Sequence, residues 1–184
     1  MFILTNFFFY ATNNTSGDSL DWRNHMKLTI LVVDDDPHIT RLRRRQFVRH
    51  GHNVLTADHG EEGLLVLKNN LKDIDVIVSD VNMPNMSGIQ MARHVRALRY
   101  RGLVILVSGK HLQDQYDDDR ATYELLRLEP PVIYAYVLKP VEQQVLLGLV
   151  EDAALQSKDH DVQERIQASI DAETETSSET KGND

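Results

Sequence analysis

The sequence predicts an α/β fold in which five parallel strands form one doubly wound sheet with helices on both faces. Short runs of β-branched and aliphatic residues recur along the chain, and a stretch of helical character follows each run. Turn residues separate the two kinds of segment. Continuous apolar runs are typical of strands that are buried on both faces, as in parallel sheets joined through helices. The length of 184 residues suits one such domain with tails.

The first two strand and helix units begin at Leu28. The run LTILVV is the first expected strand, and Pro37 suits the first turn of a helix that extends to about His50. Three apolar residues are expected to share the buried side of this helix: Ile39, Leu42 and Phe47. NVLTA is the second expected strand. The helix after it contains four consecutive apolar residues, Leu64, Leu65, Val66 and Leu67.

The remaining three units follow the same pattern. VIVS, which begins at residue 76, is the third expected strand, and LVILVS over 103–108 is the fourth. The helix between them carries apolar residues at helical spacing: Ile89, Met91, Ala92, Val95 and Leu98. VIYAYVL over 132–138 is the fifth strand, after a long segment that we expect to enlarge the fourth helix region. The last helix is expected to bury an i, i+4, i+8 stripe of Val141, Val145 and Leu149.

The two ends of the chain differ from this pattern in composition. Residues 1–25 are apolar at first and then rich in turn residues, and we expect a flexible extension; Met26 as the natural start is the alternative. The folded domain is expected over 26–156. Residues 157–184 are expected to form an acidic disordered tail, because from residue 156 onward the chain holds 8 acidic and 3 basic side chains.

Composition excludes several classes of function. The chain has no cysteine, which removes disulfides, thiolate catalysis and Cys-ligated metal sites. Its net charge of −8 provides no overall basic surface for nucleic acid. No apolar stretch approaches the length of about 20 residues that spans a membrane. We therefore expect a cytoplasmic protein that binds neither nucleic acid nor membrane.

Charged and polar side chains stand where four of the five expected strands end. Asp34, Asp35 and Asp36 follow the first strand, and Asp80 follows the third. Ser108 ends the fourth strand and Lys139 follows the fifth. The carboxyl ends of parallel strands lie at one edge, where open α/β sheets bind ligands. A carboxylate that accepts a phosphoryl group there needs a divalent cation and a fixed lysine to neutralise charge on the transferred oxygens.

The motifs LVVDDDPH, SDVNMPNMSG, VSG and YVLKP occur in this order and resemble the receiver domain of two-component response regulators over about residues 27–155. Several motifs in the right order make this match specific. The resemblance implies a flavodoxin-like sheet of strand order 2-1-3-4-5. It also implies a phospho-accepting signalling protein that is not an enzyme with substrate turnover. We expect the stand-alone, single-domain type, because little chain follows the last helix.

The resemblance implies a role for each residue at this edge. Asp80 is the phosphoacceptor, Lys139 pairs with one phosphoryl oxygen, and the Ser108 hydroxyl bonds to another. Ser108 and Tyr136 form the conformational switch, and the bond between Lys139 and Pro140 is cis. Because crowded carboxylates repel one another, a hard cation such as Mg²⁺ would relieve them. Its implied ligands are Asp34, acting largely through water, Asp35, Asp80 and the backbone carbonyl of Asn82.

The implied partners are a sensor histidine kinase or a histidine phosphotransfer protein, with an unknown downstream protein; a homodimer stays open. Five arginines in the first helix suit either a solvated face or a docking surface for the phosphoryl donor: Arg41, Arg43, Arg44, Arg45 and Arg49. Simpler structural roles are also open. The aspartates before Pro37 could cap a helix, Ser108 could only end a strand, and Tyr136 could only fill the core.

Two rival functions remain as alternatives. Phosphatases of the haloacid dehalogenase type combine the same residue types, but they need a second acid two residues after the nucleophile. That position is Asn82, whose amide cannot transfer protons in this role. A receiver-like interaction module that is never phosphorylated is the other alternative.

Overall fold

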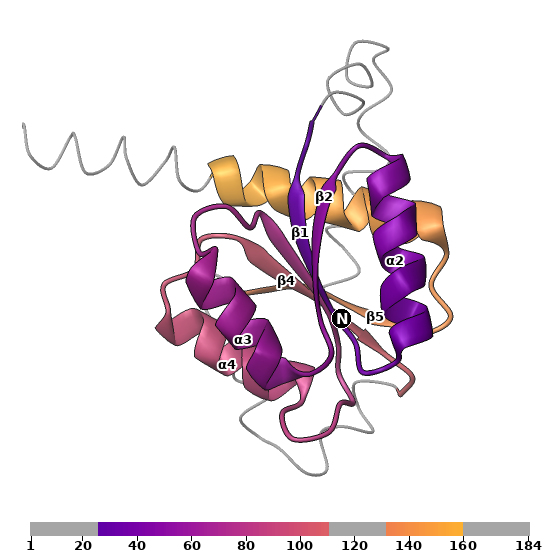
Figure 1. The fold of residues 1–184 in the computed structure, drawn as a ribbon. Coiled ribbons are helices and arrows are strands. Elements are labelled where there is room, and N and C mark those ends of the chain that lie inside the picture. Colours follow the sequence, from indigo (N-terminus) through magenta and orange to yellow (C-terminus); the bar gives the residue numbers. More distant parts are fainter. Residues whose placement is uncertain (1–25, 111–131, 160–184) are drawn as a thin grey trace, which may run out of the picture.

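The computed structural model describes residues 26–110 and 132–159, which form one parallel sheet with helices on both faces (Figure 1). The five strands lie in the order β2-β1-β3-β4-β5, which confirms the predicted fold class. The strands are β1 (Thr29–Val33), β2 (Asn53–Ala57), β3 (Val76–Asp80), β4 (Leu103–Ser108) and β5 (Ile133–Leu138). The helices are α2 (Pro37–Arg49), α3 (Gly60–Asn69), α4 (Gly88–Ala97) and a last helix over 143–159.

Three predicted segments fall wholly or largely outside the described residues. They are the N-terminal extension over 1–25, the segment 111–131 and the acidic tail. The last helix continues through residue 159, beyond the expected end of the domain at 156. Across 26–110 and 132–159, the structure contains no helix with the length and hydropathy needed to span a membrane.

The sheet separates two apolar layers. In Figure 1, α3 and α4 lie on one face of the sheet, and α2 and the last helix lie on the other. Residues that alternate along β1, β3 and β4 supply both layers. Leu31 and Ile77 face the α3 and α4 layer, whereas Val32 and Val78 face the layer under α2. All residues of β3 and β4 are buried, which is why the sequence shows continuous apolar runs there.

The buried side of α2 differs from the predicted one. Thr40, Arg43 and Phe47 are buried, whereas Leu42 is 46% exposed. The cap residue Asp36 and the short turn after β1 fix the rotation of the helix, and steps of three and four residues from Thr40 then define its inner face. A stripe chosen from apolar residues alone therefore missed the correct face. Of the five arginines in this segment, only Arg43 is buried, and the other four are exposed.

The last helix needs a similar correction. It begins at residue 143, so Val141 precedes it, and Val145 is 42% exposed. The buried face consists of Leu146, Leu147, Leu149, Val150, Ala153 and Ala154. Ala153 and Ala154 have small side chains, which let this part of the helix pack close to the sheet. The run of apolar residues on α3 is also only partly buried. Leu64 and Leu67 are buried, but Leu65 is exposed.

His52 is a buried polar residue at the edge of the sheet opposite the carboxyl ends. Its Nδ1 atom accepts a hydrogen bond from the backbone N–H of Leu28 at 3.4 Å, and its ring is tilted against Phe47. Burial lowers the pKa of the His52 imidazole, and His50 lowers it further, while Asp75 and the Met26 backbone oppose the shift. The imidazole is therefore held in its neutral form, which leaves Nδ1 able to accept.

Acidification should destabilise the fold through His52. The unfolded chain binds a proton at His52 near its usual pKa of about 6.5, whereas the folded protein binds it only at lower pH. The free energy of unfolding should therefore fall as pH decreases through about 6.5. Urea titrations of the parent, His52→Gln and the exposed control His94→Gln, which lies on α4 and does not act on His52, at several pH values measure this. Only His52→Gln should flatten the pH dependence, and equal slopes in all three proteins would contradict the assignment.

Candidate functional site

Asp80 is the last residue of β3 and lies inside the sheet, between β1 and β4. Its backbone is in register with Val107 of β4, and the next N–H, of Val81, donates to the Val107 carbonyl at 2.9 Å. The Asp80 carboxylate is buried, and its Oδ2 atom accepts the backbone N–H of Asn82 at 2.7 Å. The strand therefore ends on a fixed acid, as the sequence predicted.

Asp34 follows β1 and is held next to Asp80 by the pairing of β1 with β3. Its Oδ1 atom accepts the backbone N–H of Asp36 at 3.0 Å. Asp36 is the helix cap, since its carboxylate accepts the N–H of His38 at 2.7 Å. The Thr40 hydroxyl donates to the carbonyl oxygens of Asp34 and Asp36, which ties the strand end to the first turn of α2. The capping role left open for the three aspartates thus belongs to Asp36.

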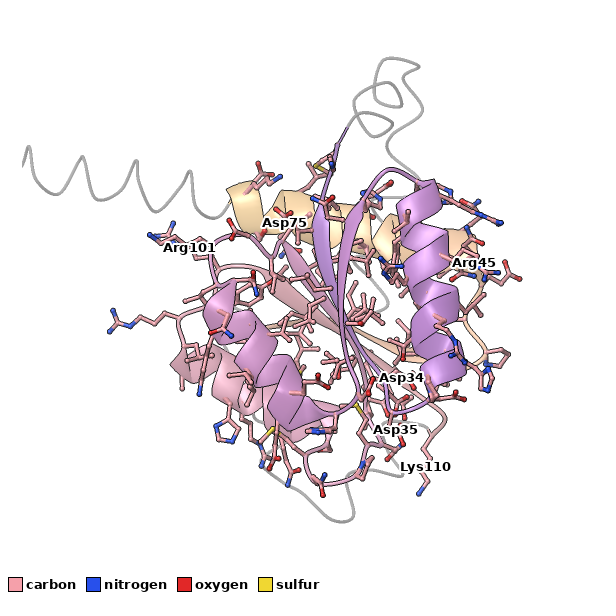
Figure 2. All side chains as sticks on the ribbon, in the orientation of Figure 1. Asp34, Asp35, Arg45, Asp75, Arg101 and Lys110 are labelled. Atoms are coloured by element: carbon pink, nitrogen blue, oxygen red, sulfur yellow. The ribbon has the colours of Figure 1, made fainter. Side chains whose placement is uncertain are left out.

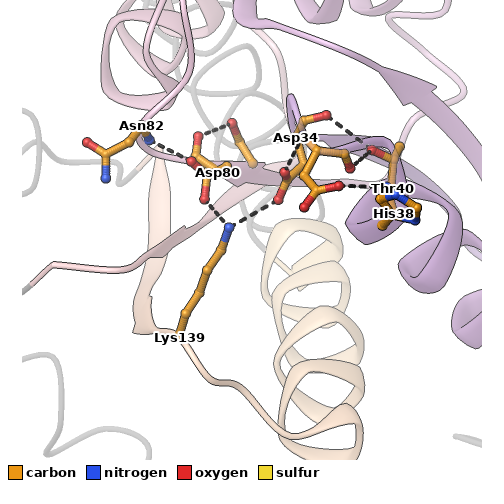
Figure 3. Close-up of polar contacts among 8 residues, drawn as sticks. Asp34, His38, Thr40, Asp80, Asn82 and Lys139 are labelled. Carbon is orange, nitrogen blue, oxygen red and sulfur yellow. Dashed lines mark hydrogen bonds and ion pairs between the residues drawn. The ribbon is translucent and has the colours of Figure 1, made fainter.

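Lys139 joins the two buried acids. Its backbone N–H donates to the Ser108 carbonyl at 2.7 Å, which fixes the residue directly after β5. Figure 3 shows the Lys139 Nζ atom between the two carboxylates. This atom lies 2.5 Å from Asp80 Oδ1 and 3.2 Å from Asp34 Oδ2. The bond between Lys139 and Pro140 is cis, as the motif implied. Three of the predicted site residues are therefore brought into direct contact.

Burial and pairing set the charge states in this cluster. Burial raises the pKa of Asp34, and the Asp80 charge adds to that rise, while the Asp36 amide and Lys139 oppose it. Burial alone would lower the pKa of Lys139, but its bonds to Asp80 and Asp34 outweigh burial and raise it. The ammonium group therefore stays charged and compensates the two acids.

The cluster only partly matches the expected magnesium site. Asp34 and Asp80 are adjacent and offer hard oxygen atoms, and Mg²⁺ commonly uses one or two carboxylates with waters. Asp35 is exposed, in contrast to its neighbour Asp34. Among the described residues, no three His, Cys, Asp or Glu side chains gather as a metal site. The donor chemistry therefore fits Mg²⁺, with Asp35 on the solvent side of the acid pair.

Ser108 and Tyr136, the two expected switch residues, both contact Lys110. Ser108 is fully buried, and its Oγ atom accepts the Lys110 N–H at 3.1 Å. The Tyr136 hydroxyl donates to the Lys110 carbonyl at 2.9 Å. The Tyr136 ring packs against the α3 and α4 layer. Both residues thus hold the turn after β4, an arrangement that the sequence motifs did not indicate.

Two glycines that the sequence analysis did not single out shape the loop after Asp80. A side chain at Gly88 would overlap the carbonyl oxygen of Asp80, and one at Gly60 would overlap the backbone of Met86. Ser87 and Gln90 form a capping box at the start of α4, which fixes the helix over Asp80. The spacing SGIQ is a capping-box signature and could have indicated where α4 begins.

Figure 2 places these observations on the whole molecule. Asp34 and Asp35 lie together near the N-terminus of α2, while Asp75 lies at the opposite end of the sheet. The acid cluster thus occupies one edge only.

Comparison with known proteins identifies the family that this chain resembles. The family model "Response regulator receiver domain" matches residues 30–151. A chemotaxis protein CheY homolog of Campylobacter jejuni is 31% identical over 127 residues, which are 68% of this chain and 91% of that protein. A crystal structure of a response regulator receiver domain protein from Clostridium thermocellum has a TM-score of 0.61 and 29% identity, and covers 71% of this chain and 97% of its own.

A longer relative matches only through part of its length. The transcriptional regulatory protein GlrR of Escherichia coli is 27% identical over 134 residues. These are 73% of this chain but only 28% of GlrR.

Proposed function

The chain belongs to the family of response regulator receiver domains, and we propose that it accepts a phosphoryl group on the Asp80 carboxylate. The observation that carries this proposal is the contact of Lys139 Nζ with both Asp80 and Asp34 at the carboxyl edge of the sheet. A carboxylate with a cation and a second acid beside it suits phosphoryl transfer, because the cation neutralises charge on the transferred oxygens.

In the proposed reaction, an Asp80 oxygen attacks the phosphorus atom of a phosphohistidine on the donor. A P–O bond forms, the P–N bond breaks, and the donor imidazole takes up a proton. Lys139 exchanges its contact with Asp34 for a phosphoryl oxygen, and the Ser108 hydroxyl donates to another oxygen. Asp34, Asp35, Asp80 and the Asn82 carbonyl would hold Mg²⁺, which would supply positive charge to the phosphoryl oxygens.

The proposed donor is a sensor histidine kinase or a histidine phosphotransfer protein, because receiver domains act with histidine kinases. The output is docking to a downstream protein. Substrate turnover of the dehalogenase type is not proposed, since Asn82 occupies the place of the second acid and its backbone N–H donates to Asp80.

Intact mass spectrometry after incubation with acetyl phosphate tests the proposal. With Mg²⁺ the protein should gain one phosphoryl group, and with EDTA it should gain none. A protein that stays unlabelled with Mg²⁺, acetyl phosphate and a set of histidine phosphotransfer proteins would be a receiver-like interaction module instead.

Mg²⁺ should also stabilise the unphosphorylated protein. A cation that binds the folded acid cluster but not the unfolded chain raises the melting temperature as its concentration increases. Asp35→Ala should lose most of this rise, whereas Asp58→Ala, an exposed acid after β2, should keep it. Differential scanning fluorimetry with and without Mg²⁺ measures the shift. If Mg²⁺ raises the melting temperature of Asp35→Ala as much as that of the parent, the cation binds elsewhere.

A further inference from the structure

Arg43 is a buried cation on the inner face of α2. It lies between Thr40, which binds the turn at Asp34, and Phe47, which packs in the apolar layer. Only 9% of Arg43 is exposed, although arginine is rarely buried without a partner for its charge. Its Nη1 atom donates to Gln46 Oε1 at 3.3 Å, a neutral acceptor. A hydrogen bond to a neutral amide does not compensate a buried guanidinium charge.

The charge of Arg43 is compensated from the acid cluster. A small cavity between α2 and the sheet is lined by Arg43 together with Asp34, Asp80 and Lys139, and apolar residues of β1, β3 and β4 complete its wall. Burial lowers the pKa of Arg43, and the nearby Asp34 charge opposes that shift. Arg43 therefore lines the same cavity as the acid pair and interacts with the Asp34 charge.

Lys139 and Arg43 differ in their freedom to move. The Lys139 side chain is 33% exposed and reaches the acids from the end of β5, so it can turn toward a new anion. Arg43 is enclosed by α2 and the sheet, and its apolar stem packs there. When Lys139 leaves Asp34 for a phosphoryl oxygen, Arg43 remains as the cation beside Asp34.

We propose that Arg43 is an electrostatic positioning residue, a buried counter-charge in the cavity beside Asp34 and Asp80 that weakens their affinity for a divalent cation. This inference rests on the proposed function, because it concerns the same acid pair. A divalent ion that binds to the acids is repelled by the buried guanidinium. The repulsion keeps cation binding weak until a phosphoryl group adds negative charge to the site.

Removing the buried charge should tighten cation binding. We expect Arg43→Met, which replaces the apolar stem and removes the guanidinium group, to bind Mg²⁺ about three- to tenfold more tightly than the parent. Mg²⁺ titration followed through the backbone amide NMR signals of Asp36 and Asn82 gives the dissociation constant without relying on stability. A residue with only a structural role would leave this constant unchanged or make binding weaker when replaced.

Arg45→Met is the matched control, since it removes the same charge from an exposed position on the outer side of α2 (Figure 2). Its effect should be less than about twofold and should disappear at about 0.5 M salt, where exposed charges are screened. The effect of Arg43→Met should persist at that salt concentration. Equal dissociation constants for Arg43→Met and the parent at both salt concentrations would overturn the inference.

Two further measurements separate the possible failures. Arg43→Lys keeps the charge and should bind Mg²⁺ within about twofold of the parent, which distinguishes charge from packing. If Arg43→Met does not fold, Arg43→Gln replaces it with the same expected direction. A parent protein that gives no Mg²⁺-dependent signal would refute the proposed metal site itself, whereas a parent that binds while Arg43→Met and Arg43→Gln are unaltered would refute only the role of Arg43.

Discussion

Asp80→Asn is expected to abolish phosphoryl transfer from acetyl phosphate. The amide lacks the negative charge and the nucleophilic oxygen that attack phosphorus, and it also loses the ion pair with Lys139. The change is nearly isosteric, so the Asn82 N–H can still donate to the side-chain oxygen. We expect the loss of label to be complete while the fold is retained, as judged by intact mass and circular dichroism on the same samples.

Asp58→Asn is the control for this experiment. Asp58 follows β2 at the same edge of the sheet, but it is exposed and outside the cluster. Asp58 should accept no phosphoryl group in the parent protein. The Asp58→Asn variant should be phosphorylated at the same rate as the parent. Persistent full labelling of Asp80→Asn would move the phosphoacceptor to another residue and overturn the proposed function.

Gly88→Ala is expected to cause a large loss of stability. The added methyl group would overlap the Asp80 carbonyl oxygen and crowd the Ser79 hydroxyl, both of which are backbone or buried groups that cannot move aside easily. Overpacking of this kind costs about 1–3 kcal/mol. The N-terminus of α4 would have to shift away from β3, and the loop that positions Asn82 would shift with it. Urea unfolding measures the change in free energy.

Gly148→Ala is a matched substitution with the opposite expected sign. Gly148 lies in the last helix, and a methyl group there would meet no atom within 4 Å. Alanine is the better helix former by up to about 1 kcal/mol, so the free energy of unfolding should rise. If both variants were destabilised equally, the loss in Gly88→Ala would reflect helix effects in general and not the contact with Asp80.

The strands were predicted well because their signal is local. β2 and β4 have the predicted bounds, and β3 extends one residue further to include Asp80. A strand buried on both faces needs only a short apolar run, so composition alone identifies it. Helix faces were predicted less well. Leu42 is exposed because the cap at Asp36 and the turn after β1 fix the rotation of α2, and Val145 of the last helix is exposed as well. The spacing of apolar residues alone contains no information about such a cap.

The candidate site followed from topology. Once the strands are parallel, Asp34, Asp80 and Lys139 must meet at one edge, and the structure brings them into contact. Arg43 could not be predicted in the same way. It lies in a run of arginines that resembles a solvated helix face, and only the rotation set at Asp36 and Thr40 turns it inward.

The contact between Lys139 and Asp34 joins residues that are 105 positions apart, which has a consequence for how the chain folds. If β1 and β3 pair without β5, two carboxylates are brought together without the cation from the end of β5. The partly assembled sheet therefore carries an electrostatic penalty that the last strand removes. Formation of this long-range contact is thus coupled to completion of the sheet, so we expect cooperative folding. During synthesis, the site cannot exist until residue 139 has left the ribosome.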